Sequence, residues 1–184
     1  TLDLDRRLPF VPGFVYIYLI CYLFWLVNYV LAAGNGKDYF YRYLSADLTA
    51  RLICFLFFVF FPTTNTRPEL VGNSLSVHLL GWLNSIDKPA NLLPSIHCMN
   101  SWFCYIAVRG REDIPRWYRI FSFVFAWLIG LSTVFIRQHV VLDIAAGFLL
   151  AELMWQFFGK TKYYKNVRQF YEKINGKIRE KLLK

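Results

Sequence analysis

Long apolar runs constrain the fold of this chain more than any other feature of its sequence. Of its 184 residues, 57% are hydrophobic and 20% aromatic, and four runs approach the ~20 apolar residues that a helix needs to cross a bilayer. A soluble domain of this length does not need so many Phe, Tyr and Trp side chains. The sequence therefore predicts an all-α fold, a polytopic transmembrane helical bundle.

Five spans are expected from these runs and from the residues that interrupt them. They cover residues 11–33, 47–61, 94–108, 117–136 and 139–158. Gly34, Pro62 and Gly159 mark the ends of the first, second and last spans. Residues 37–50 have the profile of an interfacial helix start that leads into the second span.

The basic residues predict how the chain is oriented. Lys and Arg outnumber Asp and Glu by 21 to 12, for a formal net charge of +9. These cations lie mainly in short loops and in the tail, so we expect them to orient a membrane protein and expect no nucleic-acid partner. Residues 109–119 and 160–184 share a side because two spans separate them, and the positive-inside rule makes that side cytoplasmic. The long segment 63–93, with a short surface helix at 75–83, and the turn 137–138 then face outward.

The chain divides into a transmembrane domain, residues 1–159, and a basic cytoplasmic tail, residues 160–184. Apolar residues of the tail recur at helical spacing, namely Phe170, Ile174, Ile178 and Leu182. This spacing predicts a helix that lies on an anionic lipid surface, and a partly disordered, solvated tail is the alternative. The four cysteines form no CxxC pair and lie in apolar segments, which is typical of small buried side chains.

Two ionisable residues at the start of the last span are candidates for catalysis. His139 and Asp143 are four residues apart, so a continuous helix places them on one face. A carboxylate bonded to one imidazole nitrogen fixes the tautomer and leaves the other nitrogen free to attack. The alternative is a plain intrahelical polar pair, but ionisable groups at the mouth of a membrane span are by default functional.

His97 and Arg67 converge on the same outer surface once the spans are counted. His97 follows Pro94 and Ser95 at the start of a span, where unsatisfied backbone N–H groups attract anions, and it can give a proton to a leaving oxygen. Arg67 offers the forked guanidinium that suits phosphate oxygens. A hydrogen-bonded cap residue and an interfacial anchor are the respective alternatives. Together the four side chains supply what phosphoryl transfer through a phosphohistidine needs.

Three motifs in this order resemble the type 2 phosphatidic acid phosphatase superfamily, which includes membrane lipid phosphatases and inositol phosphorylceramide synthases. The first family motif ends in Arg-Pro, as in Arg67-Pro68, and the second, Pro-Ser-Gly-His, is similar to Pro94, Ser95, Ile96 and His97. The third, Ser-Arg, five residues, His, three residues, Asp, is similar to Ser132, His139 and Asp143. The resemblance covers residues 4–153 and implies that Arg67, Pro94, Ser95, Ile96 and Ser132 contact the substrate.

Three positions depart from the family pattern. Phe60 stands in place of the first motif's Lys, Ile96 in place of the second motif's Gly, and Thr133 in place of the third motif's Arg. Arg137 is near enough to substitute, but on a continuous helix it would point away from His139. Similar losses occur in the family's head-group transferases, whose phosphodiester substrates carry less charge and need fewer cations.

The resemblance implies an integral membrane lipid phosphatase that uses a phosphohistidine intermediate. A phospholipid head-group transferase of the inositol phosphorylceramide synthase type is the alternative, and a non-catalytic lipid-binding or transport protein is an alternative of another class. No cofactor or metal is expected, because the His97, His139 and Asp143 set lacks a tight ligand motif. Likeness to a bacterial branch implies the bacterial plasma membrane. The family's six spans imply one more span before Thr1. Neither the lipid nor the oligomeric state follows from the sequence.

Overall fold

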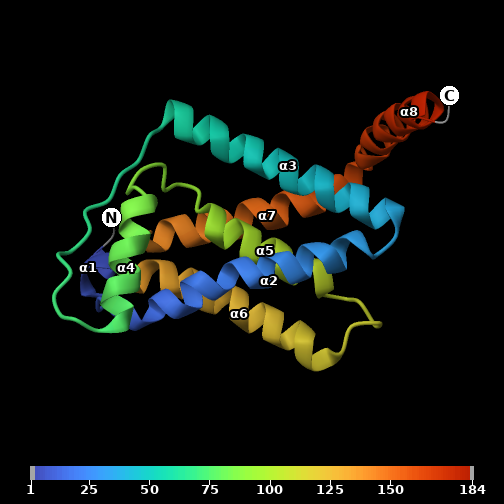
Figure 1. Cartoon of the computed structure of the whole chain (residues 1–184). Helices are drawn as coiled ribbons and strands as arrows, with labels where there is room; N and C mark the ends of the chain where they lie inside the picture. Colours follow the sequence, from blue (N-terminus) through green and yellow to red (C-terminus); the bar gives the residue numbers. More distant parts are fainter. Residues whose placement is uncertain (1–2, 183–184) are drawn as a thin grey trace.

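The computed structural model describes residues 3–182, which form a bundle of helices (Figure 1). In chain order the elements are α1 (Asp3–Arg7), the 3-10 helix η1 (Pro12–Phe14), α2 (Val15–Ala33), α3 (Lys37–Phe60), α4 (Leu75–Ile86), α5 (Ile96–Val108), α6 (Arg116–Phe135), α7 (Val141–Thr161) and α8 (Tyr164–Leu182). Within residues 3–182 the sole β-type pairing is an isolated bridge between Thr64 and Ala90. The predicted all-α bundle is confirmed.

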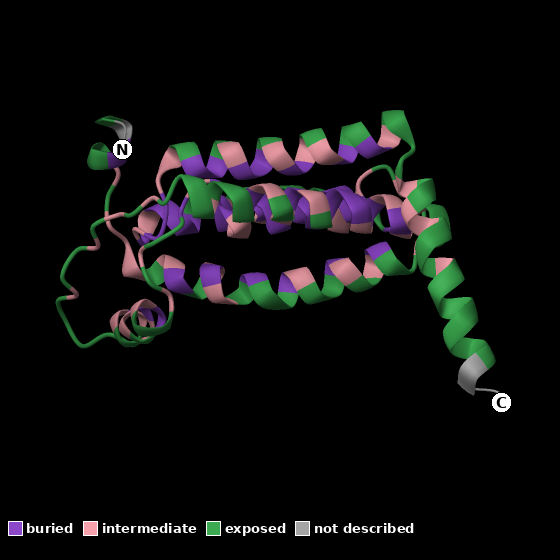
Figure 2. Cartoon of the chain, turned by 90° about the horizontal axis from the view of Figure 1, so that it is seen from above, coloured by how far each residue is buried: buried purple, intermediate pink, exposed green. Residues whose placement is uncertain are grey.

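Within the described range, four helical segments are long and apolar enough to cross a membrane. They are Pro12–Ala33, Lys37–Phe60, Arg116–Phe135 and Val141–Thr161. The buried residues lie along the inward sides of the helices (Figure 2). Large apolar side chains remain exposed, such as Leu26 and Val30, each 63% exposed. Hydrocarbon solvates such a surface better than water does. The chain is an integral membrane protein.

The remaining expected span is a short helix at the centre of the bundle. α5 has 13 residues, which gives it a length of about 20 Å. Nine of the 13 are buried, and the helix packs against α2, α6 and α7. The structure therefore surrounds one short helix with four long ones, in place of five equivalent spans.

The second long helix begins earlier than expected. α3 runs without interruption from Lys37 to Phe60, so its first turns are not a separate interfacial segment. The Tyr39 hydroxyl donates to the Ile106 carbonyl at 2.8 Å, and Tyr43 is buried. The crowded aromatic residues thus pack α3 against the bundle. The sequence pattern alone does not distinguish such packing from a position at the membrane surface.

The last long helix differs from its prediction at both ends. It begins at Val141 and not at His139, because Val140 is extended, with φ −108° and ψ 164°. It also continues past Gly159 to Thr161. A Cβ at Gly159 would collide with the guanidinium of Arg42, so this glycine provides room for a neighbouring helix and does not end α7.

The two ends of the bundle differ in structure (Figure 1). One end, hereafter the loop end, carries α1, α4, residues 61–95 and the turn at 136–140. The opposite end, hereafter the hairpin end, carries the connections 34–36 and 109–115 and leads to α8. At the loop end, α4 lies where a short helix was predicted, and Leu80 and Leu83 bury themselves in a cluster with Val15 and Tyr18. At the hairpin end, the tail is helical over Tyr164–Leu182 and not disordered.

Candidate active site

A cavity of about 220 Å³ opens at the loop end, where the predicted site residues meet. Its polar wall is formed by Arg67, Asp87, His97, Gln138 and His139, and its apolar wall includes Phe58, Leu92 and Ile96. These residues come from the segment 61–95, from α3 and α5, and from the turn before α7. The structure thus brings together three residues that the sequence singled out, Arg67, His97 and His139.

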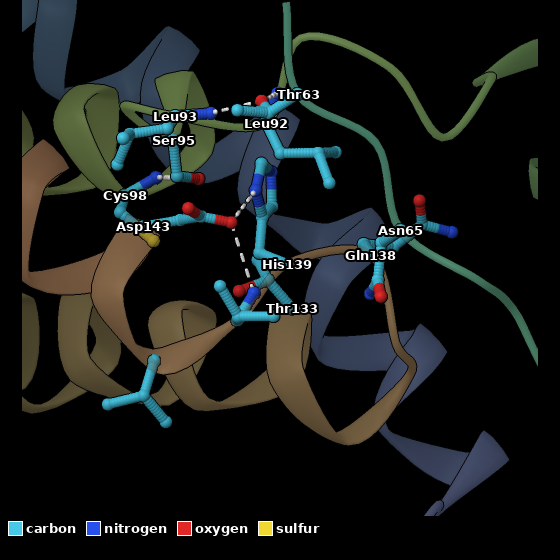
Figure 3. A network of polar contacts seen from close by, with 12 residues as sticks. Thr63, Asn65, Leu92, Leu93, Ser95, Cys98, Thr133, Gln138, His139 and Asp143 are labelled. Carbon is cyan, nitrogen blue, oxygen red and sulfur yellow. Dashed lines mark hydrogen bonds and ion pairs between the residues drawn. The ribbon is translucent and has the colours of Figure 1, made fainter. Parts of the chain in front are cut away.

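His139 is held by Asp143, as expected, but not on one helix. Its Nδ1 lies 3.2 Å from Asp143 Oδ2, and the same carboxylate oxygen accepts the Val140 N–H at 3.1 Å (Figure 3). His139 itself lies in the turn before α7, and its N–H donates to the Thr133 carbonyl at 3.0 Å. The expected continuous helix face is wrong, because the extended Val140, with φ −108° and ψ 164°, interrupts the expected helix between the two residues. Both partners are buried, and with Nδ1 engaged the unbound ring nitrogen is Nε2.

A glycine brings the helix of His97 against the helix of Asp143. A Cβ on Gly147 would lie 2.5 Å from the Ser95 carbonyl oxygen and 3.0 Å from Cys98 Cβ. The Ser95 N–H also donates to the Asp143 carbonyl at 3.3 Å. This close approach of α5 and α7 fixes the spacing of the two histidines, because each one is tied to one of these helices.

His97 is the second residue of α5, and its ring faces that of His139 across 6.0 Å between centroids. Tyr18 on α2 contacts it, with 2.8 Å between the hydroxyl and His97 Nε2. The same hydroxyl donates to Asp87 Oδ2 at 3.1 Å. Sequence reasoning missed this bridge. Tyr18 is one of 12 tyrosines and lies inside an apolar run, so nothing in the sequence marks it.

Arg67 enters the cavity from the long loop and is fixed by two acceptors. One Nη donates to the Asp87 carbonyl, and the other to Gln138 Oε1. Burial lowers the pKa of Arg67 from its ordinary value, while Asp87 acts to raise it, and a guanidinium stays charged at any such value. Gln138, which is buried, also donates to Asn84 on α4 at 2.8 Å. Its place directly before His139 was the one signal that could have identified it.

The remaining predicted contact residues lie at different distances from the cavity. Ile96 lines it. Pro94 and Ser95 are buried behind it, and the Ser95 hydroxyl accepts the Cys98 N–H at 3.3 Å as the cap of α5. Ser132 is buried within α6 and donates to the Ile129 carbonyl at 2.6 Å. The structure does not bring Ser132 into the site.

Two family cations are replaced, and nothing in the cavity restores them. Phe60 is 69% exposed on the outer surface. The Thr133 hydroxyl donates to the Gly130 carbonyl at 2.7 Å, inside α6. Arg137 donates to the Asp5 and Leu8 carbonyls, so it fastens the N-terminal segment to the turn. Among the residues described, Arg67 is therefore the one arginine that lines this cavity.

A second hollow adjoins the cavity and shares Arg67 with it. It measures about 480 Å³ and is also lined by Arg6 and Arg137. Cations thus stand beside the site without entering it. Within residues 3–182, no group of three or more His, Cys, Asp and Glu side chains is arranged to hold a metal ion.

Comparison with known proteins gives one match. A family model described as the PAP2 superfamily matches residues 14–166, which include every residue of the cavity. Neither the curated proteins nor the solved structures yield a match to this chain.

Proposed function

Because the chain belongs to the PAP2 superfamily, we propose that it cleaves a phosphate ester bond of a membrane lipid by hydrolysis, through a phosphohistidine at His139. The family generally comprises phosphatases and phosphotransferases, which supports an enzyme of this type. One observation carries the finer assignment. Asp143 engages Nδ1 of His139 at 3.2 Å, so Nε2 is left as a nucleophile beside His97.

In the proposed reaction, His139 Nε2 attacks phosphorus, a P–N bond forms, and the bond from phosphorus to the lipid oxygen breaks. His97 gives a proton to that oxygen, and Asp143 compensates the charge on the His139 ring. Water then attacks phosphorus, the P–N bond breaks, and His97 takes the proton back. Arg67 and the N-terminal turn of α5, at Ile96, hold the phosphate oxygens.

Tyr18 and Asp87 have a positioning role in this proposal. A hydroxyl 2.8 Å from His97 Nε2, itself bonded to a carboxylate, orients the imidazole and stabilises its protonated form. Neither residue needs to touch the lipid. Tyr18 and Asp87 thus orient His97, as Asp143 orients His139.

A specific observation supports a second candidate, the transfer of a phospholipid head group to an alcohol. The carboxylate of Asp87 shares the cavity with Arg67, so the positive charge that faces a phosphate is partly offset. A phosphodiester carries one negative charge where a monoester carries up to two, and it tolerates this weaker field better. In this reaction the acceptor alcohol takes the place of water.

Phosphohistidine trapping tests the shared first step. Protein incubated with a lipid carrying labelled phosphate is quenched without acid, and the label is mapped. We expect label on His139 in the wild type and none in His139→Ala. The matched control is His78→Ala, which removes an exposed histidine of α4 outside the cavity. Labelling or full turnover in folded His139→Ala would remove the proposal, and a wild type inert toward every lipid would favour a non-catalytic lipid-binding protein.

A substrate panel separates the two candidates. Lipid phosphate monoesters and phosphodiesters are supplied with and without acceptor alcohols, and free phosphate and new lipids are both measured. Free phosphate from a monoester without acceptor supports the phosphatase. A new lipid that appears only with a phosphodiester and an alcohol supports the transferase and rejects the phosphatase.

We also propose that the loop end faces outward, with the transmembrane domain at residues 1–159 and the basic tail at residues 160–184 on the cytoplasmic leaflet. The four native cysteines are buried, so introduced thiols report cleanly on accessibility. An impermeant maleimide should label Asn73→Cys in intact cells and Glu112→Cys only after permeabilisation. The reverse pattern would invert the orientation.

A further inference from the structure

Another polar cavity lies at the hairpin end, far from both histidines. It measures about 350 Å³ and opens between α5 and α6. Arg109, Arg116 and Arg119 line it, together with Tyr105, Ile120 and Phe123. α6 has 20 residues, about 30 Å of helix, and the catalytic cavity is at its other end. This cavity is therefore not a part of the site described above.

Among residues 3–182, two of the three arginines in this cavity have no ionic partner. Arg109 forms a forked pair with Glu152 on α7, at 2.7 and 2.8 Å, so its charge is compensated. Arg116 and Arg119 form no ion pair within residues 3–182. The Nε atom of Arg119 is moreover buried without a hydrogen-bond acceptor. A buried donor without an acceptor is costly, and an anion bound here would accept from it, as a substrate phosphate would from Arg67 Nε, which is in the same state.

The other wall of the cavity is apolar and leads into the bilayer. Arg116, Arg119, Ile120 and Phe123 follow one another at helical spacing, so they share one face of α6. Ile120 is 53% and Phe123 40% exposed, and the Phe123 ring packs edge-on against Tyr105 at 5.1 Å. Along this face the lining changes from cationic to apolar within about two helical turns, or roughly 10 Å.

We propose that this cavity binds an anionic phospholipid of the leaflet at the hairpin end. The lipid phosphate lies between Arg116 and Arg119, and an acyl chain lies along Ile120 and Phe123. A basic pocket between membrane helices is a known way to hold such head groups. The lipid is a bound component and not the substrate, because it sits at the opposite end of α6 from His139. It secures α5 against α6 where the connecting loop is long and charged.

Lipid retention by purified protein tests this site, with His139→Ala as the background to prevent turnover. Native mass spectrometry and thermal unfolding are run with phosphatidylglycerol, phosphatidylcholine or inorganic phosphate. We expect phosphatidylglycerol to be retained and to raise the Tm, and the other two to do neither. The double variant Arg116→Gln/Arg119→Gln should bind it about twenty-five-fold more weakly, from roughly five-fold for each cation.

The matched control is Lys173→Gln/Lys177→Gln, which removes the same charge from exposed positions of α8 at the same end. It should keep at least half of the wild-type affinity. Equal retention by both double variants, or equal protection by phosphatidylcholine or by free phosphate, would overturn the proposal. If the glutamine variant does not fold, the lipid preference of the unsubstituted cavity decides the question, because equal retention of phosphatidylcholine and phosphatidylglycerol would overturn the proposal.

Discussion

The two ends of the bundle both gather arginine, and they engage it differently. At the loop end, the guanidinium of Arg67 donates to the Asp87 carbonyl and to Gln138. Arg137 likewise donates to carbonyls of the N-terminal segment, at Leu8 with 2.7 Å. These arginines hold loops in place around the histidines, and protein oxygens occupy much of their hydrogen-bonding capacity.

At the hairpin end, two guanidinium groups remain available to bind an anion. Arg116 and Arg119 face a cavity without an ionic partner among the described residues, while Arg109 is satisfied by Glu152. The number of cations near a cavity therefore does not determine its affinity for anions. What counts is how many of the N–H donors are already engaged by protein oxygens, because an engaged guanidinium offers a ligand fewer hydrogen bonds.

The largest effect that can test this comparison is expected at the His139–Asp143 pair. Asp143→Asn keeps the size of the side chain but removes the charge that orients the imidazole and compensates the phosphohistidine. We expect turnover to fall by about three to four orders of magnitude, as in other His-carboxylate pairs, with little change in Tm. Steady-state kinetics on folded protein measure it. Asp113→Asn, in the exposed hairpin, is the control, and an equal loss there would show a general effect of charge.

The next effect concerns the one arginine of the catalytic cavity. Arg67→Lys preserves the charge but loses the fork that reaches the Asp87 carbonyl and Gln138 together. We expect a loss of about a hundred-fold in kcat/KM, because phosphate alignment and the position of the turn before α7 both suffer. Arg6→Lys makes the same change in the adjoining hollow and should alter kcat/KM by less than about two-fold. A larger effect of Arg6→Lys would place the substrate's phosphate in that hollow.

The parts of this architecture that sequence reasoning predicted are those that depend on local pattern. Apolar runs gave the long helices, because a bilayer imposes length and hydrophobicity directly on each segment. Counting spans placed Arg67, His97 and His139 at one end before any contact was known. Helix order accounts for the end of the bundle that they share, whereas their assembly around one cavity also needs the close approach of α5 and α7 at Gly147.

The parts that sequence reasoning missed depend on contacts between distant segments. Tyr18 reaches His97 across 79 positions of sequence, so no local pattern pairs them. The predicted turn at 137–138 continues to an extended Val140, which periodicity does not detect because it reports the spacing of side chains and not the backbone torsion angles. The ion pair of Glu152 with Arg109 also joins two helices and is visible only once they are packed.

That ion pair offers a third test, at the hairpin end. Glu152→Gln leaves Arg109 partly buried without its carboxylate, and we expect the free energy of unfolding to fall by about 2 kcal/mol. Turnover should persist, since Glu152 is far from the histidines. Because Arg109 becomes a third unpaired cation of the cavity, phosphatidylglycerol should bind a few-fold more tightly.

Glu112→Gln, on the exposed hairpin, should change neither stability nor lipid affinity. Unchanged lipid binding in a destabilised Glu152→Gln would show that pairing does not control the cavity.

The smallest effect isolates a single hydroxyl at the loop end. Tyr18→Phe keeps the ring packed on His97 but removes the link from Nε2 to Asp87, so the imidazole is less well oriented and its protonated form less stable. We expect kcat to fall about ten-fold while KM stays within two-fold, because the hydroxyl acts on proton transfer and not on binding.

Tyr22→Phe is the matched control. Its ring also meets His97 edge-on, at 6.3 Å, yet the side chain is half exposed and makes no hydrogen bond to the histidine among the described contacts. Equal kcat in Tyr18→Phe and the wild type would mean that packing alone orients His97. A selective loss in Tyr18→Phe would show that each histidine of this site depends on an oxygen partner from its own side of the cavity.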